Sequence, residues 1–167
     1  MSNTSENLSA AFAGESQASR KYTYFAEKAD QEGHKWAARL FRAAAEAETI
    51  HARNHLRVMQ GIGTTAENLQ AAINGENYEF TEMYPEFIKT ARNEGNQAAA
   101  KSFDMANKVE KVHHQLYTEA LEKLDNKKAE ELQPVYVCPV CGNTMEGDAP
   151  DRCPVCGTQK KMFKQIE

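Results

Sequence analysis

The pattern Glu-x-x-His occurs twice, at Glu48 to His51 and at Glu110 to His113, and restricts the fold more than any other feature of the sequence. Residues three positions apart project from the same face of a helix. Both pairs interrupt rows of apolar residues with helical spacing, so both are expected to face a core between helices. Buried carboxylates without a counter-charge are strongly unfavourable. A shared metal cation would compensate them, and surface or salt-bridged acids are the simpler alternative.

Apolar periodicity predicts an all-α arrangement of two helical hairpins around these pairs. The four long helices are expected at residues 3–29, 35–59, 78–94 and 96–125. Asn3-x-x-Glu6 is a capping pattern for the first helix. Residues 61–77 are expected to form a long connection containing a short helix, and Pro85 is expected to kink or loosen the third helix. Two hairpins joined by one long crossover is the connectivity of ferritin-like four-helix bundles.

The two remaining helices also place acids on their apolar faces. Glu15 lies on the stripe of the first helix, and Glu79 and Glu82 share one face of the third. Di-iron and di-manganese bundles use one Glu from each of two helices and Glu-x-x-His from each of the other two. The sequence contains the same combination of glutamates and Glu-x-x-His pairs on its four expected helices. Tyr22 is a candidate to hydrogen-bond a metal-bound carboxylate, with core packing as the equal alternative, and His55 is expected to be structural.

All four cysteines lie in a second, separate pattern near the end of the chain. Cys138-Pro139-Val140-Cys141-Gly142 and Cys153-Pro154-Val155-Cys156-Gly157 are matching knuckles. Each presents two thiolates to one tetrahedral metal, and the glycine lets the backbone turn around the sulfur atoms. Zinc and iron both fit, so a structural zinc ribbon is the alternative. A neighbouring di-metal core favours iron, because only a redox metal would deliver electrons to it.

Composition and the N-terminal sequence limit the possible binding partners and the cellular location of the chain. A formal charge of −4 with no basic stripe argues against nucleic-acid binding, and no apolar run approaches the ~20 residues of a membrane span. The N-terminus lacks the basic start and apolar core of a signal peptide, so we expect a cytoplasmic protein in a reducing compartment. We expect two domains, a bundle with its linker at residues 1–133 and a cysteine domain at residues 134–167.

With both parts described, the chain closely resembles the rubrerythrin family, in which a ferritin-like di-iron bundle is fused to a rubredoxin-type domain. The resemblance spans nearly all 167 residues. It is carried by Gly14-Glu15-Ser16-Gln17-Ala18, Glu46-Ala47-Glu48-Thr49-Ile50-His51-Ala52, Glu82-Met83-Tyr84-Pro85, Glu110-Lys111-Val112-His113 and Tyr136-Val137-Cys138-Pro139.

The resemblance implies a peroxidase that reduces hydrogen peroxide to water in defence against oxidative stress. Electrons would come from NAD(P)H through a separate reductase or a rubredoxin, and zinc could replace iron in some preparations. The resemblance also implies a ligand set: Glu15, Glu82 and His51 on one iron, Glu79 and His113 on the other, and Glu48 and Glu110 bridging. The main alternative is a ferritin-like ferroxidase that stores iron, although a storage role would not need the cysteine domain.

The position of the cysteine domain leads to a prediction about assembly. The fourth helix is expected to continue about 12 residues beyond His113, or roughly 18 Å, before the linker begins. The cysteine domain would then start far from the metal site of its own chain. We therefore expect a head-to-tail homodimer, or a higher homo-oligomer, in which each cysteine domain lies beside the partner's di-metal site. Rubrerythrins resemble this arrangement.

Overall fold

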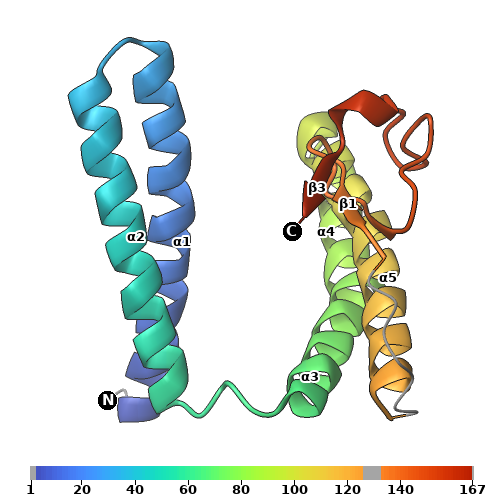
Figure 1. Ribbon diagram of the computed structural model, residues 1–167, viewed down its shortest axis with the longest axis horizontal. Coiled ribbons are helices and arrows are strands. Elements are labelled where there is room, and N and C mark those ends of the chain that lie inside the picture. The colour runs from blue at the N-terminus through green and yellow to red at the C-terminus, as the bar shows by residue number, and fades with distance from the viewer. Residues whose placement is uncertain (1–2, 126–132, 167) are drawn as a thin grey trace. The chain divides into compact units, whose positions relative to one another are not determined.

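The computed structural model describes residues 3–125 and 133–166 and divides into two compact units. The first unit ends at Gly63 and the second begins at Thr64. Figure 1 shows helices in both units and short strands near the C-terminus. Within the described residues, none of the helices combines the length and apolar character that a membrane span requires.

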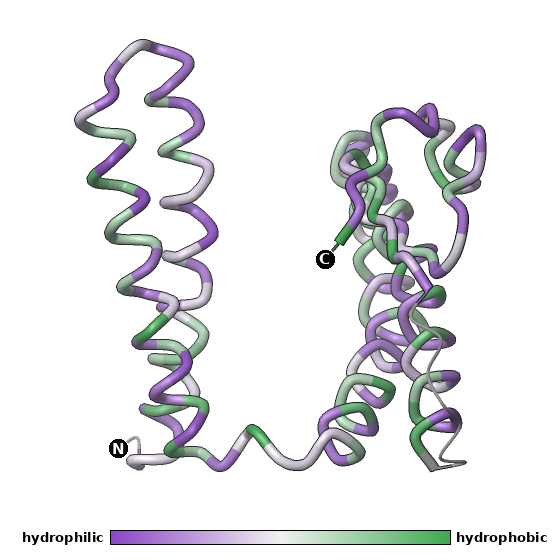
Figure 2. The backbone as a smooth tube through the Cα atoms, in the orientation of Figure 1, coloured by the Kyte–Doolittle hydropathy of each residue, from purple (hydrophilic) through white to green (hydrophobic). Residues whose placement is uncertain are grey.

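The first unit is an antiparallel hairpin of α1 (Thr4–Gln31) and α2 (Lys35–Val58). Asn3 caps α1: its side chain accepts a hydrogen bond from the Glu6 N–H, and the Glu6 carboxylate accepts one from the Asn3 N–H. The predicted boundaries of both helices are confirmed to within about two residues. Figure 2 shows hydrophobic and hydrophilic residues alternating along both helices, as expected for an amphipathic pair.

Small side chains form the contact between α1 and α2. The buried apolar residues of the hairpin are Ala26, Ala29, Ala38, Ala45 and Ala52. A hydrogen bond of 2.9 Å between the hydroxyls of Ser19 and Thr49 also links the helices. Ser19 lies one turn after Glu15, and Thr49 directly follows Glu48, so this bond aligns the helices where their acids meet.

The second unit begins with a continuous helical segment formed by α3 (Thr65–Tyr78), the π-helix η1 (Glu79–Met83) and α4 (Tyr84–Asn93). Both α3 and α4 pack against α5 (Gln97–Asp125). The expected connection is therefore helical from Thr65 onward, and the third helix does not begin at Tyr78. The Thr64 side chain caps α3, and a single glycine such as Gly75 does not end a helix.

The π-helix accounts for the disturbance expected at Pro85. Proline has no backbone N–H, so Pro85 cannot bond the carbonyl four residues before it. The helix widens just before this position, where the N–H of Tyr84 donates to the carbonyl of Glu79, five residues back. A π-turn loosens the helix without ending it. The segment thus stays helical, but the residues in η1 have a different angular spacing from those in α3.

The cysteine domain is a three-stranded antiparallel sheet. Its elements are β1 (Val135–Val137), β2 (Thr144–Glu146), the 3-10 helix η2 (Lys160–Met162) and β3 (Lys164–Ile166), with strand order β2-β1-β3. Gly142 and Gly157, at φ +81° and +78°, close the two knuckles, and each donates its N–H to the carbonyl of the first cysteine of its knuckle. The predicted linker at 126–133 lies outside the described residues except for its last one, and the predicted division at 133/134 stays a prediction.

The cysteine domain packs against α5 through β2 and the knuckle that precedes it. A methyl group placed on Gly142 would lie 3.9 Å from Cγ1 of Val109, which is itself buried. At the other end of β2, the Lys123 ammonium forms a 2.8 Å ion pair with Glu146. These contacts explain why the second unit includes both the helices and the sheet.

Candidate metal centres

The four cysteines form one compact cluster. The Sγ atoms of Cys138 and Cys156 are 3.5 Å apart, and those of Cys141 and Cys153 are 3.6 Å apart. These separations are far longer than the ~2.05 Å of a disulfide. They are close to the ~3.8 Å between neighbouring ligands of a tetrahedron with metal–sulfur bonds of about 2.3 Å. The cluster fits a four-thiolate metal site, as predicted.

The surroundings of these sulfur atoms favour at least one thiolate. The Thr158 hydroxyl lies 3.1 Å from Sγ of Cys156, and this hydrogen bond is the main cause that lowers the pKa of Cys156 to about 6. Burial raises the pKa of Cys141. A bound cation would replace the proton of such a buried thiol, because metals bind thiolates rather than thiols.

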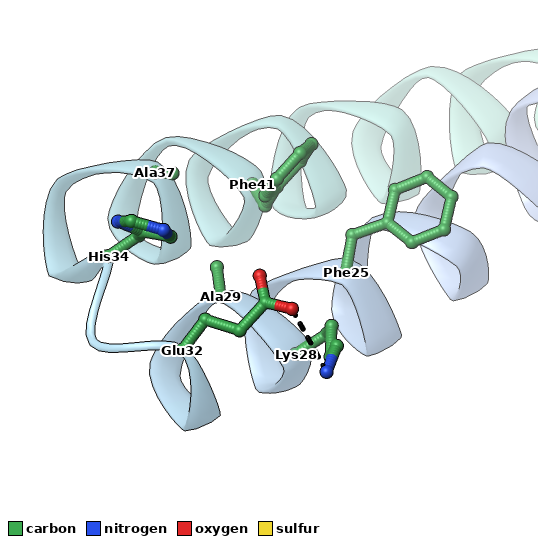
Figure 3. Close-up of a pocket in the computed structure, with 7 residues that line it drawn as sticks. All are labelled: Phe25, Lys28, Ala29, Glu32, His34, Ala37 and Phe41. Atoms are coloured by element: carbon green, nitrogen blue, oxygen red, sulfur yellow. Dashed lines mark ion pairs between the residues drawn. The ribbon is translucent and has the colours of Figure 1, made fainter.

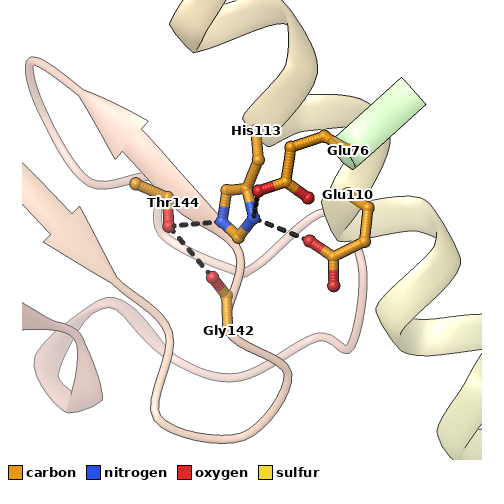
Figure 4. Close-up of polar contacts among 5 residues, drawn as sticks. All are labelled: Glu76, Glu110, His113, Gly142 and Thr144. Carbon is orange, nitrogen blue, oxygen red and sulfur yellow. Dashed lines mark hydrogen bonds and ion pairs between the residues drawn. The ribbon is translucent and has the colours of Figure 1, made fainter. Parts of the chain in front are cut away.

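A second cluster joins Glu76, Glu110 and His113 on α3 and α5 (Figure 4). Nδ1 of His113 is 2.7 Å from Oε2 of Glu110 and 4.0 Å from Oε1 of Glu76. One ligand atom from each of the three residues lies within 4.8 Å of the others. Carboxylate oxygens and an imidazole nitrogen that converge in this way fit a non-haem metal ion.

Crowded negative charge marks this cluster as a cation site. Burial, followed by the charge of Glu110, raises the pKa of Glu76 to about 7. The same two causes raise the pKa of Glu79. Burial is the main cause that raises the pKa of Tyr84, with further contributions from Glu110, Glu79 and Glu76. A metal ion would stabilise the charged carboxylates against both burial and the repulsion from Glu110.

Glu76 is a site residue that the sequence analysis missed. It had been assigned to the connection, because the third helix was expected to begin at Tyr78. The capping box at Thr64 and Glu67 marks where the expected short helix begins, but it gives no signal that this helix continues past Gly75 to Tyr78.

Glu82 behaves differently from the two glutamates before it. Its side chain is exposed, and the acids gathered with His113 among the described residues are Glu76 and Glu110, with Glu79 close by. Glu79 and Glu82 both lie in the π-helix, where each turn takes more residues than in an α-helix, so the α-helical spacing used to pair them does not apply. The assignment of Glu82 as a ligand stays a prediction.

A third cluster, in the first unit, joins Glu15, Glu48 and His51. Nδ1 of His51 is 2.9 Å from Oε2 of Glu48. The hydrogen bond between the two carboxyls raises the pKa of Glu15 and lowers that of Glu48. The charge of His55 also lowers the pKa of Glu15, which places this histidine near the cluster. The predicted residues of this hairpin therefore meet as expected from their stripes.

Tyr22 takes part in an aromatic group beyond this cluster. Its ring centroid is 6.2 Å from those of Phe25 and Phe41. These contacts agree with the core-packing alternative, and the proposed hydrogen bond to a ligand carboxylate stays a prediction. A pocket of about 370 Å³ lies next to the same rings at the tip of the hairpin (Figure 3). Phe25 is about 15 Å along α1 from Glu15, so the pocket is separate from the acid cluster.

The cysteine domain lies against His113, the candidate metal ligand of its own chain. Oγ1 of Thr144, in β2, is 2.9 Å from Nε2 of His113. The expectation that the domain lies far from its own chain's site is therefore wrong, because β2 contacts α5 from Thr144, at His113, to Glu146, at Lys123. The head-to-tail dimer itself stays a prediction.

Metal uptake by the Glu76 cluster should weaken as the pH falls below about 7. Glu76 must lose its proton to bind a metal, and its pKa in the folded protein is about 7. His113, whose pKa is raised mainly by the hydrogen bond to Glu110, must also lose a proton, so both effects have the same sign. Cobalt(II) titrations of the metal-free bundle between about pH 5.5 and 8 would measure the change. Glu76→Gln should flatten part of this pH dependence, and an affinity independent of pH in the unmodified protein would contradict the expectation.

Comparison with known proteins agrees with both parts of the structure. The family model described as Rubrerythrin matches residues 6–121, and the model described as Rubrerythrin, rubredoxin-like domain matches residues 136–164. Rubrerythrin-2 of Clostridium acetobutylicum is 35% identical over 175 residues, which cover 96% of this chain and 95% of that protein. Nigerythrin of Nitratidesulfovibrio vulgaris is 37% identical over an alignment of 174 residues, which covers 96% of this chain and 85% of that protein.

Solved structures lead to the same fold. A structure of nigerythrin in a mixed-valence state has a TM-score of 0.59 and 36% identity, and it covers 99% of this chain and 88% of that one. The predicted fold, a ferritin-like bundle with a rubredoxin-like domain, is confirmed by these matches together with the four-cysteine cluster. The chain belongs to the rubrerythrin family.

Proposed function

We propose that this protein is a non-haem di-iron peroxidase, which reduces hydrogen peroxide to water and takes its electrons from the four-cysteine iron. The observation that supports this most is the contact between the two kinds of site. The cysteine domain lies directly on His113, which belongs to a carboxylate–histidine cluster. A structural zinc ribbon would have no reason to lie on a metal ligand of the bundle.

Each of the two carboxylate clusters is proposed to supply ligands to a di-metal centre. Such centres take ligands from four helices, and each unit of this chain offers two helices with acids and one Glu-x-x-His pair. We propose the ligands Glu15, Glu48, His51, Glu76, Glu79, Glu110 and His113, with Glu48 and Glu110 as the bridging pair. Cys138, Cys141, Cys153 and Cys156 would hold the third metal, where zinc could replace iron.

Iron in these sites would supply reversible one-electron chemistry, and the residues of the chain would control binding and protons. A solved structure of nigerythrin is described as fully reduced and all ferrous, so that protein holds iron in the reduced state. Reduction of one peroxide molecule to two waters consumes two electrons and two protons. Tyr84, whose pKa is raised, stays protonated at neutral pH and can donate its O–H near the acids. His113 holds Nδ1 toward the same acids.

The source of the electrons lies outside the chain. We propose that NAD(P)H supplies them through a separate reductase or a rubredoxin, because the cysteine cluster lies near a surface from which a partner could reach it. Cys141 and Cys156 are only partly buried, and Val140 between the first pair of cysteines is exposed. A cytoplasmic location and assembly as a homodimer remain predictions.

Chemically reduced, iron-loaded protein mixed with hydrogen peroxide should be oxidised rapidly and in proportion to the peroxide added. The protein should contain about three irons per chain, because it has one four-cysteine site and one di-metal site. Stopped-flow absorbance would follow both sites, and size measurements would detect a mineral core. The ferroxidase alternative predicts growing iron deposition instead. A single zinc per chain and an empty bundle after iron-replete expression would contradict the redox function.

A further inference from the structure

The side chain of Thr144 lies between the cysteine domain and the carboxylate cluster. Its Oγ1 is 2.9 Å from Nε2 of His113 and 3.0 Å from the carbonyl oxygen of Gly142, which directly follows Cys141 (Figure 4). The opposite side of the same imidazole, at Nδ1, faces Glu110 and Glu76. One hydroxyl thus connects a cysteine knuckle to the ring that faces the acids.

The hydrogen atoms available on these groups determine the direction of each bond. A threonine hydroxyl has one hydrogen to donate, and a carbonyl can only accept. Thr144 therefore donates its hydrogen to Gly142 and can only accept from His113. Nε2 of His113 must carry the hydrogen of that bond, since two acceptors do not bond each other.

This direction decides which ring nitrogen is free to bind a metal. A neutral imidazole carries one hydrogen, so a hydrogen on Nε2 leaves the lone pair on Nδ1. Nδ1 is the atom that lies 2.7 Å from the Glu110 carboxylate. Two lone pairs at this distance repel unless a cation lies between or beside them, and that cation is either a proton or a metal ion.

We propose that Thr144 is a positioning residue, which fixes His113 as the Nε2–H tautomer and so directs Nδ1 to the metal. Metal-binding histidines generally need such a partner on the other ring nitrogen, and it is normally a carboxylate, a carbonyl or a water. Here a hydroxyl of the cysteine domain does this, so the packing of β2 on α5 supplies the partner of Nε2 of His113 from the same chain. The inference rests on the proposed function only in that His113 is taken as a metal ligand.

Substitution of Thr144 in the full-length protein tests this role. Thr144→Val has nearly the same shape but cannot accept a hydrogen bond, and Thr144→Ser keeps the hydroxyl. We expect Thr144→Val to lower the affinity of the bundle site for cobalt(II) by about 10–100-fold and Thr144→Ser to restore most of it. Thr118→Val is the matched control, because its hydroxyl, also bonded to α5, donates to the carbonyl of His114. The absorbance of the four-cysteine iron would report whether each variant is folded.

The tautomer can be measured without any variant of Thr144. In the zinc-loaded protein, nitrogen-15 NMR should show the hydrogen of the His113 ring on Nε2 and the metal on Nδ1, and His113→Gln would identify the signals. In Thr144→Val the Nε2 hydrogen should exchange faster with solvent. A hydrogen on Nδ1, or a folded Thr144→Val protein with unchanged metal affinity, would overturn the proposal.

Neither measurement uses peroxide, so the two proposals can fail separately. One outcome would refute the peroxidase function alone. In it, iron-loaded protein does not react with peroxide, but the Nε2–H tautomer is observed and Thr144→Val lowers the affinity for cobalt(II). Active protein whose Thr144→Val variant binds cobalt(II) normally would refute the positioning role alone.

Discussion

Replacing Glu110 with alanine should abolish the oxidation of the reduced protein by hydrogen peroxide, with a loss of about 100-fold or more in rate. Glu110 lies at the centre of the second cluster. Its carboxylate bonds Nδ1 of His113, and, after burial, its charge is the next cause that raises the pKa values of Glu76, Glu79 and Tyr84. Removing it leaves His113 without its partner and the proposed centre without a bridging ligand.

The colour of the four-cysteine iron makes this experiment specific. The cysteine cluster shares no ligand with Glu110, so Glu110→Ala protein should remain red and reducible. Glu119→Ala is the matched control, because Glu119 lies further along α5, where it accepts a hydrogen bond from Gln115. Glu48→Ala should behave like Glu110→Ala, since Glu48 is the corresponding residue of the other cluster. Rapid peroxide turnover in both ligand variants would contradict the assignment of the bundle as the peroxide site.

Helices and their caps could be predicted from the sequence because local interactions determine them. Asn3 and Glu6 form the expected capping box, and the ends of α1 and α2 lie within about two residues of their predicted positions. The cysteine cluster was equally predictable, since two knuckles of fixed spacing bring four thiolates together whatever lies around them. Both features depend on residues that are close in sequence.

The docking of the cysteine domain depends on contacts that are distant in sequence. Thr144 and His113 are 31 positions apart, and the segment between them includes the predicted linker. Helix length indicated where α5 ends, but not in which direction the chain continues after it. The prediction that the domain lies away from its own His113 failed for this reason.

The ligands on the third helix are hard to predict from the sequence because the prediction assumes a constant helical spacing. That spacing holds in α3 and fails in η1, where the N–H of Tyr84 bonds a carbonyl five residues back. A sequence motif can show that acids precede Pro85, but it does not show where the helix widens. Glu76 lies in the cluster with Glu110 and His113, and the assignments of Glu79 and Glu82 stay predictions.

Glu76→Gln and Glu82→Gln should have opposite outcomes. Glu76 lies within 4.8 Å of the other ligand atoms, and burial beside Glu110 raises its pKa to about 7, whereas Glu82 is exposed. Glutamine has nearly the same shape as glutamate but lacks the charge that holds a cation, so Glu76→Gln should lose much of its bundle metal and its peroxide turnover, by about 10–100-fold. Glu82→Gln should retain both if Glu82 lies outside the centre.

Iron analysis and stopped-flow oxidation of both variants, each with an intact red cysteine site, would measure this difference. The comparison is well matched, because the two glutamates are six positions apart on one continuous helical segment and undergo the same substitution. Full activity in Glu76→Gln together with metal loss in Glu82→Gln would show that the helix is rotated when metal is bound. In that case the ligand set expected from the family resemblance would hold, and the π-turn at Glu79–Met83 would be the element whose rearrangement brings Glu82 into the centre.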